Sequence, residues 1–421
     1  MSEISDMVQR LCPEGVEYRK LGELGSFYSG LSGKSKDDFK DGNAMFINYL
    51  NVYSNPSLNL DVHEKVRIYE GEKQNTIQQG DLLFTGSSET PDECGMSSVV
   101  IEQPRENAYL NSFCFGLRLF NPKRFDLIYL KHLLRSTEIR KLISGTASGV
   151  TRFNVSKKRF ASVSIPVPPL EVQRKIGEVL DNFSELTAEL TAELTARQKQ
   201  YEYYRDNLLS FNNINRGGQN EVKWLTLSEI GTFTRGRRFV RNDVVEEGYP
   251  CIHYGDMYTY YGLSATETKT FINEALASKL RFAHKNDVVI VGAGENDEDI
   301  GIGLAWLGDS SPAVHDACYI FHHEQNPKYI SHYLRTHSYH QQIKKYVSSG
   351  KICSISAEGI GKAIIPIPSL EEQARIVDIL DKFENLTTNL AEGLPAEIKA
   401  RQQQYEYYRD KLLTFKRKEV A

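Results

Sequence analysis

Apolar residues recur at alternating steps of four and three over two long stretches of the chain. In the first stretch they include Ile176, Leu180, Phe183, Leu190, Leu194 and Tyr201. In the second they include Ile376, Leu380, Phe383, Leu390 and Tyr405. This spacing is typical of the buried seam of a coiled coil. We therefore predict two long helices. Because neither seam has an obvious partner within its own globular part, we expect the two helices to pack against each other, antiparallel, as a spacer.

Prolines mark where the first helix begins. Pro166, Pro168 and Pro169 precede it, and proline is not tolerated inside a helix. About 40 helical residues at ~1.5 Å each predict a rod of roughly 60 Å. In the second stretch Gly393 and Pro395 predict either a kink or a break.

The same two stretches are copies of each other. Residues 200–211 read QYEYYRDNLLSF and residues 404–415 read QYEYYRDKLLTF, with ten of twelve positions identical. Upstream, IPVPPLEVQRKI at 165–176 matches IPIPSLEEQARI at 365–376. The unit beginnings also match, more faintly, as do the glycine loops after Asp81 and Asp287. A duplication of this length indicates internal pseudo-twofold character rather than a solenoid.

The repeat predicts an α+β fold with two globular domains separated by the two helices. The predicted boundaries are residues 1–167 and 213–367 for the globular domains, and 168–212 and 368–421 for the helical spacers.

Composition narrows the class of protein. The chain has 421 residues, 25% of them charged, with a net charge of −4. No stretch approaches 18 apolar residues, the start lacks a signal-peptide pattern, and the six cysteines form no CxxC pair. These features predict a cytoplasmic protein with reduced thiols and no membrane span. Basic clusters at 131–159 and 235–241 are of the kind that neutralises phosphates, although a solvated helix face or loop explains them equally well.

The two halves, the IPxPxLExQ motif before each helix and the QYEYYRD motif near its end resemble specificity subunits of type I restriction–modification enzymes. The tandem Thr-Ala-Glu-Leu at 187–190 and 191–194 resembles the subgroup whose central helix carries such repeats. The resemblance implies two target recognition domains, each reading one half of a split DNA site, in a phage-defence system. It implies a non-catalytic chain that binds no cofactor of its own. Two modification subunits with S-adenosylmethionine would methylate adenine, and motor–nuclease subunits would use ATP and magnesium.

The tandem repeat suggests a geometric hypothesis. One tetrapeptide adds ~6 Å of helix and a net winding of about 40°. B-DNA advances about 3.4 Å and roughly 36° per base pair. We therefore expect one added or removed tetrapeptide to change the gap between half-sites by about one base pair, with some tilt absorbing the axial mismatch.

Several catalytic signatures fail on spacing. The run from Gly30 to Ser35 resembles a phosphate loop but lacks its first glycine, and Gly292-Ala-Gly294 lacks the third glycine of a dinucleotide site. The chain contains no NPPY-like or HExxH motif, and we expect no metal site. Two alternatives remain open, a self-sufficient DNA methyltransferase or nuclease and a purely structural coiled-coil adaptor.

The DNA contacts are expected on loops that recur in both halves and carry hydrogen-bond donors, because arginine pairs with guanine and asparagine with adenine while lysines hold phosphates. In the first half the candidates are Lys34, Lys36, Ser87, Ser88, Thr151, Arg152, Asn154, Lys157, Lys158 and Arg159. In the second they are Arg235, Arg237, Arg238, Arg241, Tyr254, Glu295, Asn296, Lys351 and Ser354.

Two features of these regions keep more than one interpretation. The acidic loops around Glu89 and Glu295 are most simply structural turns, with base reading as the next interpretation and a metal site as the least favoured. Tyr254, Tyr258, Tyr260 and Tyr261 could face DNA, but such stretches are more often core or rim.

Overall fold

The computed structural model describes residues 2–211, 222–388 and 393–419. The chain forms two compact units, and neither is continuous in sequence. The first unit combines Met1–Glu189 with Ile398–Ala421, and the second is Leu190–Glu397. Each unit therefore contains one globular domain and one segment from each of the two predicted helical stretches.

The first unit contains a four-stranded sheet in the order β2-β9-β5-β7. Smaller sheets have the orders β4-β3-β8, β10-β11-β6 and β1-β12. Its strands are β1 (Tyr18–Lys20), β2 (Gly25–Ser29), β3 (Ala44–Ile47), β4 (Lys65–Val66), β5 (Leu82–Thr85), β6 (Ser87–Ser88), β7 (Ser97–Val99), β8 (Ala108–Leu110), β9 (Cys114–Leu119), β10 (Ala147–Gly149), β11 (Phe153–Val155) and β12 (Ser164–Pro166). Its helices are α1 (Ser2–Leu11), α2 (Leu21–Leu24), η1 (Lys36–Phe39), α3 (Tyr49–Ser54), η2 (Pro122–Arg124), α4 (Leu127–Leu133), α5 (Thr137–Ser144) and α6 (Lys157–Ala161).

The second unit has a five-stranded sheet in the order β14-β23-β19-β21-β17. Its other sheets have the orders β15-β18-β16-β22, β20-β24 and β13-β25. Its strands are β13 (Lys223–Thr226), β14 (Gly231–Arg235), β15 (Val244–Val245), β16 (Tyr249–Ile252), β17 (Ser264–Ala265), β18 (Thr270–Ile272), β19 (Val288–Val291), β20 (Ala293–Gly294), β21 (Gly303–Trp306), β22 (Ala313–Val314), β23 (Cys318–His323), β24 (Cys353–Ser354) and β25 (Ile364–Ile367). Its short helices are α8 (Leu227–Ile230), η3 (Arg241–Asp243), α9 (Tyr254–Thr259), η4 (Glu274–Lys279), α10 (Pro327–Tyr333), α11 (His337–Lys344) and α12 (Ala357–Gly361).

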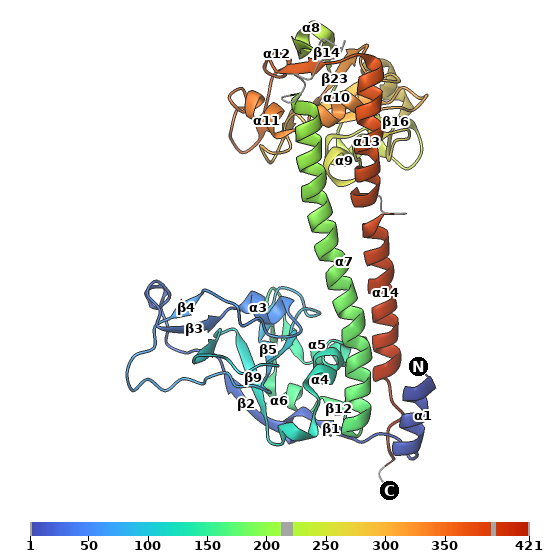
Figure 1. Ribbon diagram of the computed structural model, residues 1–421. Coiled ribbons are helices and arrows are strands. Elements are labelled where there is room, and N and C mark those ends of the chain that lie inside the picture. Colours follow the sequence, from blue (N-terminus) through green and yellow to red (C-terminus); the bar gives the residue numbers. More distant parts are fainter. Residues whose placement is uncertain (1, 212–221, 389–392, 420–421) are drawn as a thin grey trace. The chain divides into compact units, whose positions relative to one another are not determined.

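The two units repeat one topology. In each, a first strand pairs antiparallel with the strand that leads into a long helix, as β1 does with β12 and β13 with β25. The parallel pair β3·β8 of the first unit has its counterpart in β16·β22 of the second. The predicted class, two domains of helix and sheet connected along the chain by a long helix (Leu170–Ser210, α7 in Figure 1), is confirmed.

The long helices are α7 (Leu170–Ser210), α13 (Leu370–Thr388) and α14 (Leu394–Leu413). Helix α7 is continuous for 41 residues. The second stretch is divided between α13 and α14, so the alternative of a break is the correct one, and Pro395 occupies the second position of α14, where it needs no intrahelical donor. Predicted seam residue Leu390 lies outside the described residues.

The expectation that the seams have no partner in their own globular part is wrong for the first turns of each helix. Val172, Ile176 and Leu180 are fully buried in one cluster with Tyr129 and Leu130 of α4. In the second unit Ile376, Val377 and Leu380 join Tyr329 and Ile330 of α10 in the same way. The spacing alone could not reveal this because α4 and α10 are too short for their apolar faces to be recognised.

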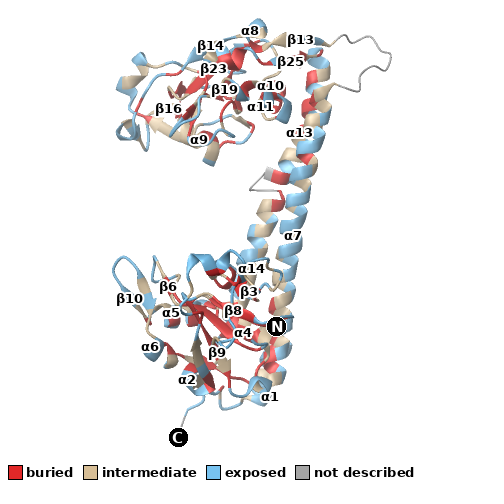
Figure 2. Cartoon of the chain, turned by 90° about the vertical axis from the view of Figure 1, so that its left-hand side faces the viewer, coloured by how far each residue is buried: buried red, intermediate tan, exposed pale blue. Residues whose placement is uncertain are grey.

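Farther along α7 the seam is present but shallower. Phe183, Leu190 and Leu194 are half-buried, and the intervening positions of the tandem tetrapeptides are mostly exposed, as Figure 2 shows for the middle of α7. Aromatic side chains join the helical segments within each unit. Phe183 stacks on Tyr408 with ring centroids 5.3 Å apart in the first unit, and Tyr204 stacks on Phe383 at 5.4 Å in the second.

All six cysteines are described and none forms a disulfide. Among the helices the structure describes, none is both long and apolar enough to cross a membrane.

Candidate nucleic-acid interface

Strand pairing brings together two loops that lie far apart in the sequence of the first unit. Strand β11 pairs antiparallel with β10, which makes residues 147–155 a hairpin. The same strand pairs with β6, which places Asn154 opposite Ser87 and Phe153 opposite Ser88. The glycine loop after Gly86 and the basic loop at 148–159 therefore form one surface, whose hairpin β10 marks in Figure 2.

The tip of this hairpin is exposed and presents Arg152. Val150 is 91% exposed, and Thr151, Arg152 and Asn154 are exposed as well. The Arg152 guanidinium lies over the Phe113 ring, 4.8 Å from its centroid, and its Nη2 donates to the Ser87 hydroxyl at 3.3 Å. These two contacts orient the side chain and leave further donors of its fork available, since a guanidinium carries five N–H groups.

The backbone of the hairpin depends on a glycine. Gly149 has φ +155°, and a Cβ there would lie 2.0 Å from the Arg152 carbonyl oxygen. A side chain at position 149 would therefore push the tip out of the geometry that presents Arg152.

A basic helix follows the hairpin. The Ser156 hydroxyl caps the N-terminus of α6 by accepting from the Arg159 amide. Lys157, Lys158 and Arg159 all lie exposed in its first turn. Lys157 donates to the Ser29 hydroxyl at 2.9 Å, and Arg159 is anchored on the Gly145 carbonyl.

The second unit repeats this backbone with different side chains. Strand β24 pairs with β20, so Ala293 lies opposite Ser354, and Ser348 and Ser354 form the equivalent of the hairpin pairing. Its exposed tip carries Lys351 and Ile352, the latter 64% exposed, where the first unit has Thr151 and Arg152. Glu295 and Asn296 lie exposed in the adjoining glycine loop.

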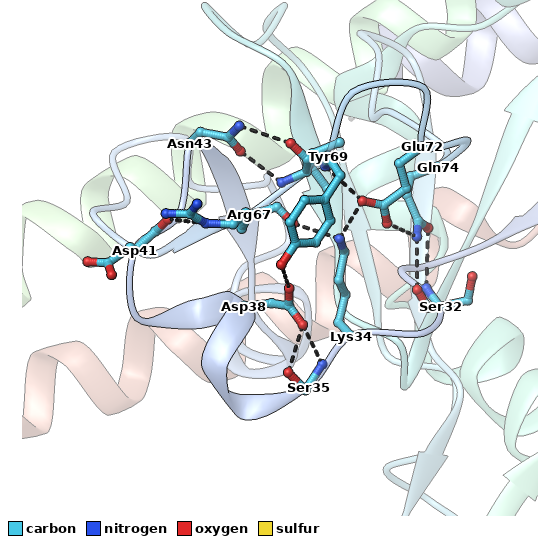
Figure 3. A network of polar contacts seen from close by, with 11 residues as sticks. Ser32, Lys34, Ser35, Asp38, Asp41, Asn43, Arg67, Tyr69, Glu72 and Gln74 are labelled. Atoms are coloured by element: carbon cyan, nitrogen blue, oxygen red, sulfur yellow. Dashed lines mark hydrogen bonds and ion pairs between the residues drawn. The ribbon is translucent and has the colours of Figure 1, made fainter.

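The two candidate lysines near the start of the first unit, Lys34 and Lys36, differ in their exposure to solvent. The Lys34 side chain is only 5% exposed, and its ammonium donates to the Arg67 carbonyl and to Glu72, each at 2.6 Å (Figure 3). The Lys34 hydrogen bond, with the Tyr69 amide and Gln74, lowers the pKa of Glu72 to about 2. These contacts support a structural role for Lys34, whereas Lys36 is exposed.

Arginines near the start of the second unit surround a small cavity. Arg237, Arg238 and Arg241 are exposed. The first two line a cavity of about 440 Å³ together with Lys279 and Arg281. Arg235 donates to the Asp316 carbonyl at 2.8 Å.

The tyrosines behind these arginines mostly pack inside the second unit. Tyr254 is half-buried against the rings of His253 and His315. Tyr258 is half-buried and Tyr261 is 8% exposed, whereas Tyr260 is 59% exposed. The interpretation that these tyrosines belong to the core or its rim therefore fits Tyr254, Tyr258 and Tyr261.

The cations at 131–140 are not available as a phosphate-binding stripe. Lys131 forms an ion pair with Asp181. Arg135 donates to the carbonyls of Ser97, Val52 and Tyr53, and Arg140 to those of Gly95, Asp92 and Cys94. These side chains hold the fold together, so neither phosphate binding nor a solvated face describes this part of the basic cluster.

The acidic loop of the first unit also serves the fold. Glu93 accepts from the hydroxyls of Ser88 and Tyr53 at 2.8 and 2.9 Å, and these bonds lower its pKa. Gly95 has φ +66°, and a Cβ there would lie 2.5 Å from Ile143. Both observations favour the structural turn over metal-dependent chemistry.

Sequence reasoning missed a Tyr–His–Asp network that occurs in both units. In the first, His132 Nδ1 and the Tyr405 hydroxyl form a hydrogen bond of 2.9 Å, while His132 Nε2 faces Asp181 at 3.3 Å. Burial lowers the pKa of His132, and the hydrogen bond to His132, together with Lys131, lowers the pKa of Asp181 to about 2. The second unit has the equivalent His332, with Tyr201 at 3.1 Å and Asp381 at 3.5 Å.

Each network joins a short helix of the globular domain to two long helical segments. The sequence signal was available, because Tyr129, His132 and Arg135 recur as Tyr329, His332 and Arg335. Among the described residues, His332, Asp381 and Glu384 form the group whose side chains could hold a metal ion.

Two copies of one fold, each with an exposed hairpin beside a glycine loop, define a two-domain protein with an internal repeat. Comparison with known proteins identifies its family. The model of the type I restriction modification DNA specificity domain matches residues 13–197 and again 219–400. The chain belongs to this family, whose specificity subunits are recognition subunits and not catalysts.

Individual relatives agree with this family. The chain is 36% identical over 284 residues to the specificity subunit of the EcoR124I/EcoR124II type I restriction enzyme of Escherichia coli, a match spanning 64% of this chain and 66% of the relative. A chain from a solved structure on complex assembly and conformational transition of a type I restriction–modification system has the same fold. Its TM-score is 0.63 at 15% identity, with 95% of this chain and 97% of that chain covered.

Proposed function

We propose that this chain recognises a bipartite double-stranded DNA target, one half-site per unit, through the surface formed by the hairpin and glycine loop of each unit. The observation that carries the proposal is the shared backbone with different side chains. Both units have the same strand register at this surface, but Arg152 of the first is replaced by Ile352 in the second. Two surfaces that share one backbone but carry different side chains at the hairpin tip are suited to recognising two different DNA sequences.

Within the first unit, Arg152 is the candidate for direct base reading. It is exposed, it is oriented by Phe113 and Ser87, and the cations of α6 follow directly. Lys157, Lys158 and Lys36 would contribute phosphate contacts, which position the protein but carry no sequence information. In the second unit Arg237, Arg238 and Arg241 take the phosphate role, and Lys351, Glu295 and Asn296 the reading role.

The partners follow from the duplicated helices. Tyr203 of α7 and Tyr407 of α14 occupy the same position in the repeated QYEYYRD motif and are 66% and 60% exposed. Two equivalent aromatic surfaces suit two copies of one modification subunit, which would supply S-adenosylmethionine and the methyltransferase site. Restriction subunits would bring ATP and magnesium.

The test is the substitution Arg152→Ala in the assembled modification complex. Losing one arginine–guanine pair costs ~1–3 kcal/mol, so methylation at the half-site read by the first unit should fall ~5- to 150-fold or relax in sequence. Methylome sequencing would measure this at every site in one genome. The matched variant is Lys351→Ala, which removes a candidate reading residue from the hairpin tip of the other unit.

The two substitutions should affect opposite half-sites. If Arg152→Ala weakened both half-sites equally, or changed neither, its assignment to one half-site would be wrong. Should Arg152→Ala abolish DNA binding at every sequence while the complex stays folded, the arginine would be a phosphate contact instead.

A further inference from the structure

Three polar side chains of the second unit converge at the junction of α10 and α13. His332 comes from α10, and Asp381 and Glu384 from successive turns of α13. One ligand atom from each lies within 4.8 Å of the others. His332 is fully buried, and Asp381 and Glu384 are half-buried.

Two atoms in this group lack a hydrogen-bond partner among the described residues. His332 Nε2 and Asp381 Oδ1 are both buried and stand 3.5 Å apart, which is too long for a good hydrogen bond. Burying polar atoms without partners is unfavourable. The remaining atoms are engaged, since Tyr201 holds His332 Nδ1 at 3.1 Å and Lys328 holds Asp381 Oδ2 at 2.6 Å.

The first unit provides an internal comparison. There His132 Nε2 reaches Asp181 at 3.3 Å, and the position equivalent to Glu384 is Ser184. Arg135 Nε donates to the Ser97 carbonyl at 2.8 Å, whereas the equivalent Arg335 Nε has no partner within the described chain. The second unit thus adds a carboxylate beside a His–Asp pair whose facing atoms are less well satisfied.

We propose that His332, Asp381 and Glu384 bind a divalent transition-metal ion of the zinc type. One imidazole nitrogen and two carboxylate oxygens form a ligand set suited to such an ion, which prefers nitrogen and oxygen donors in this combination over the all-oxygen shell of magnesium. Tyr201 and Lys328 fix the orientation of two of the ligands, which is the usual task of groups around a metal site.

The charges nearby set the strength of the site. Lys328 and Arg335 oppose a dication, but Lys328 contacts the outer oxygen of Asp381, and Arg335 Nη2 donates to the carbonyls of Gly262 and Gly303. We therefore expect these two cations to weaken the binding of the ion without preventing it. Glu384, Tyr201 and Arg335 line a cavity of about 1640 Å³, through which an ion can enter and water can complete its coordination.

Such an ion would fasten α10 of the globular domain to α13. The proposed site differs from the sequence-based expectation of no metal site, which rested on the absence of a short-range ligand motif. His332 precedes Asp381 by 49 residues and Glu384 by 52, so no local spacing could reveal the group.

The experiment uses the full chain, stripped of metal with a chelator and titrated with Zn²⁺ by calorimetry, and with Co²⁺ by its visible absorption. We expect one equivalent bound per chain, with little competition from magnesium. Glu384→Ser, which installs the side chain of the first unit, should weaken this binding at least ~10-fold, because removing a ligand costs no less than removing a supporting contact. Asp378→Ser, at an exposed carboxylate of the same helix, should leave it unchanged.

Circular dichroism of each variant would confirm folding. If Glu384→Ser proved unfolded, Glu384→Gln would replace it, because it keeps the shape and the oxygen that accepts from the Leu263 amide at 3.2 Å. The proposal is overturned if the parent chain binds no Zn²⁺, if the folded Glu384 variant binds it as well as the parent, or if Asp378→Ser loses it equally. None of these outcomes depends on DNA recognition.

Discussion

Replacing Gln173 with alanine should lower the free energy of unfolding of the first unit by about 2–5 kcal/mol. The Gln173 side chain is fully buried where α7 begins. Its Oε1 accepts from the Asp126 amide at 2.9 Å, and its Nε2 donates to the carbonyls of Pro168 at 2.7 Å and Arg124 at 3.2 Å. Alanine would leave these backbone groups buried without partners, at ~1–3 kcal/mol for each that water cannot reach.

The repeat supplies a second copy of the same experiment. Gln373 accepts from the Asn326 amide at 2.9 Å and donates to the Pro368 carbonyl at 3.0 Å. Gln373→Ala should therefore destabilise the second unit to a similar extent. Gln198→Ala, at an exposed position of α7, should change the free energy by less than ~0.5 kcal/mol.

Urea unfolding of the full chain, followed by circular dichroism and by amide exchange in each unit, would measure all three variants. The reasoning is refuted if Gln173→Ala and Gln373→Ala unfold at the same urea concentration as Gln198→Ala. It is also refuted if the loss of protection in each case falls on the other unit.

Two further predictions concern α7 and pH. One added Thr-Ala-Glu-Leu after Leu194 should widen the gap between methylated half-sites by about one base pair, since it adds ~6 Å and a net 40° of helix, and an unchanged gap in the methylome would contradict this. Burial lowers the pKa of His323 in the folded chain to about 4, whereas a histidine of the unfolded chain has its ordinary pKa of 6.5. Because the unfolded chain binds the proton more readily, the free energy of unfolding should fall as the pH drops from about 6.5 toward 4. Between pH 7 and 5 the free energy of unfolding, measured with urea, should therefore fall less in His323→Gln than in the parent, by about 2 kcal/mol at pH 5. Equal pH dependence of the two proteins would exclude this histidine as a cause.

The sequence predicted those features that repeat with a recognisable local signal. The duplicated QYEYYRD motif and the four-three spacing were sufficient for two helical stretches and two domains, and the prolines located the start of α7. Repetition also selected the loops that β6 and β11 bring together in the first unit and β20 and β24 in the second.

Other features depended on long-range contacts that spacing cannot encode. Arg135 and Arg140 looked like solvated cations, but they donate to carbonyls of segments some 40 to 80 residues away. Lys34 was a candidate DNA contact because of its positive charge alone. Its partners, the Arg67 carbonyl and the Glu72 carboxylate, lie on another loop. A cation's charge is visible in a sequence, but whether a carbonyl or a phosphate satisfies it is decided by the fold.

The duplication also explains where this chain can change. Gln173 and Gln373, His132 and His332, and Asp181 and Asp381 are repeated because each pair performs the same task, holding a globular domain on its helices. The hairpin tips perform no such task, since Arg152 and Ile352 occupy equivalent places on the same backbone. Glu384 is an exception to this repetition, because the equivalent residue is Ser184 while the His and Asp of the same network are identical in both units. Titration with Zn²⁺ of the parent chain and of Glu384→Ser tests whether this difference between the two units reflects a metal ligand.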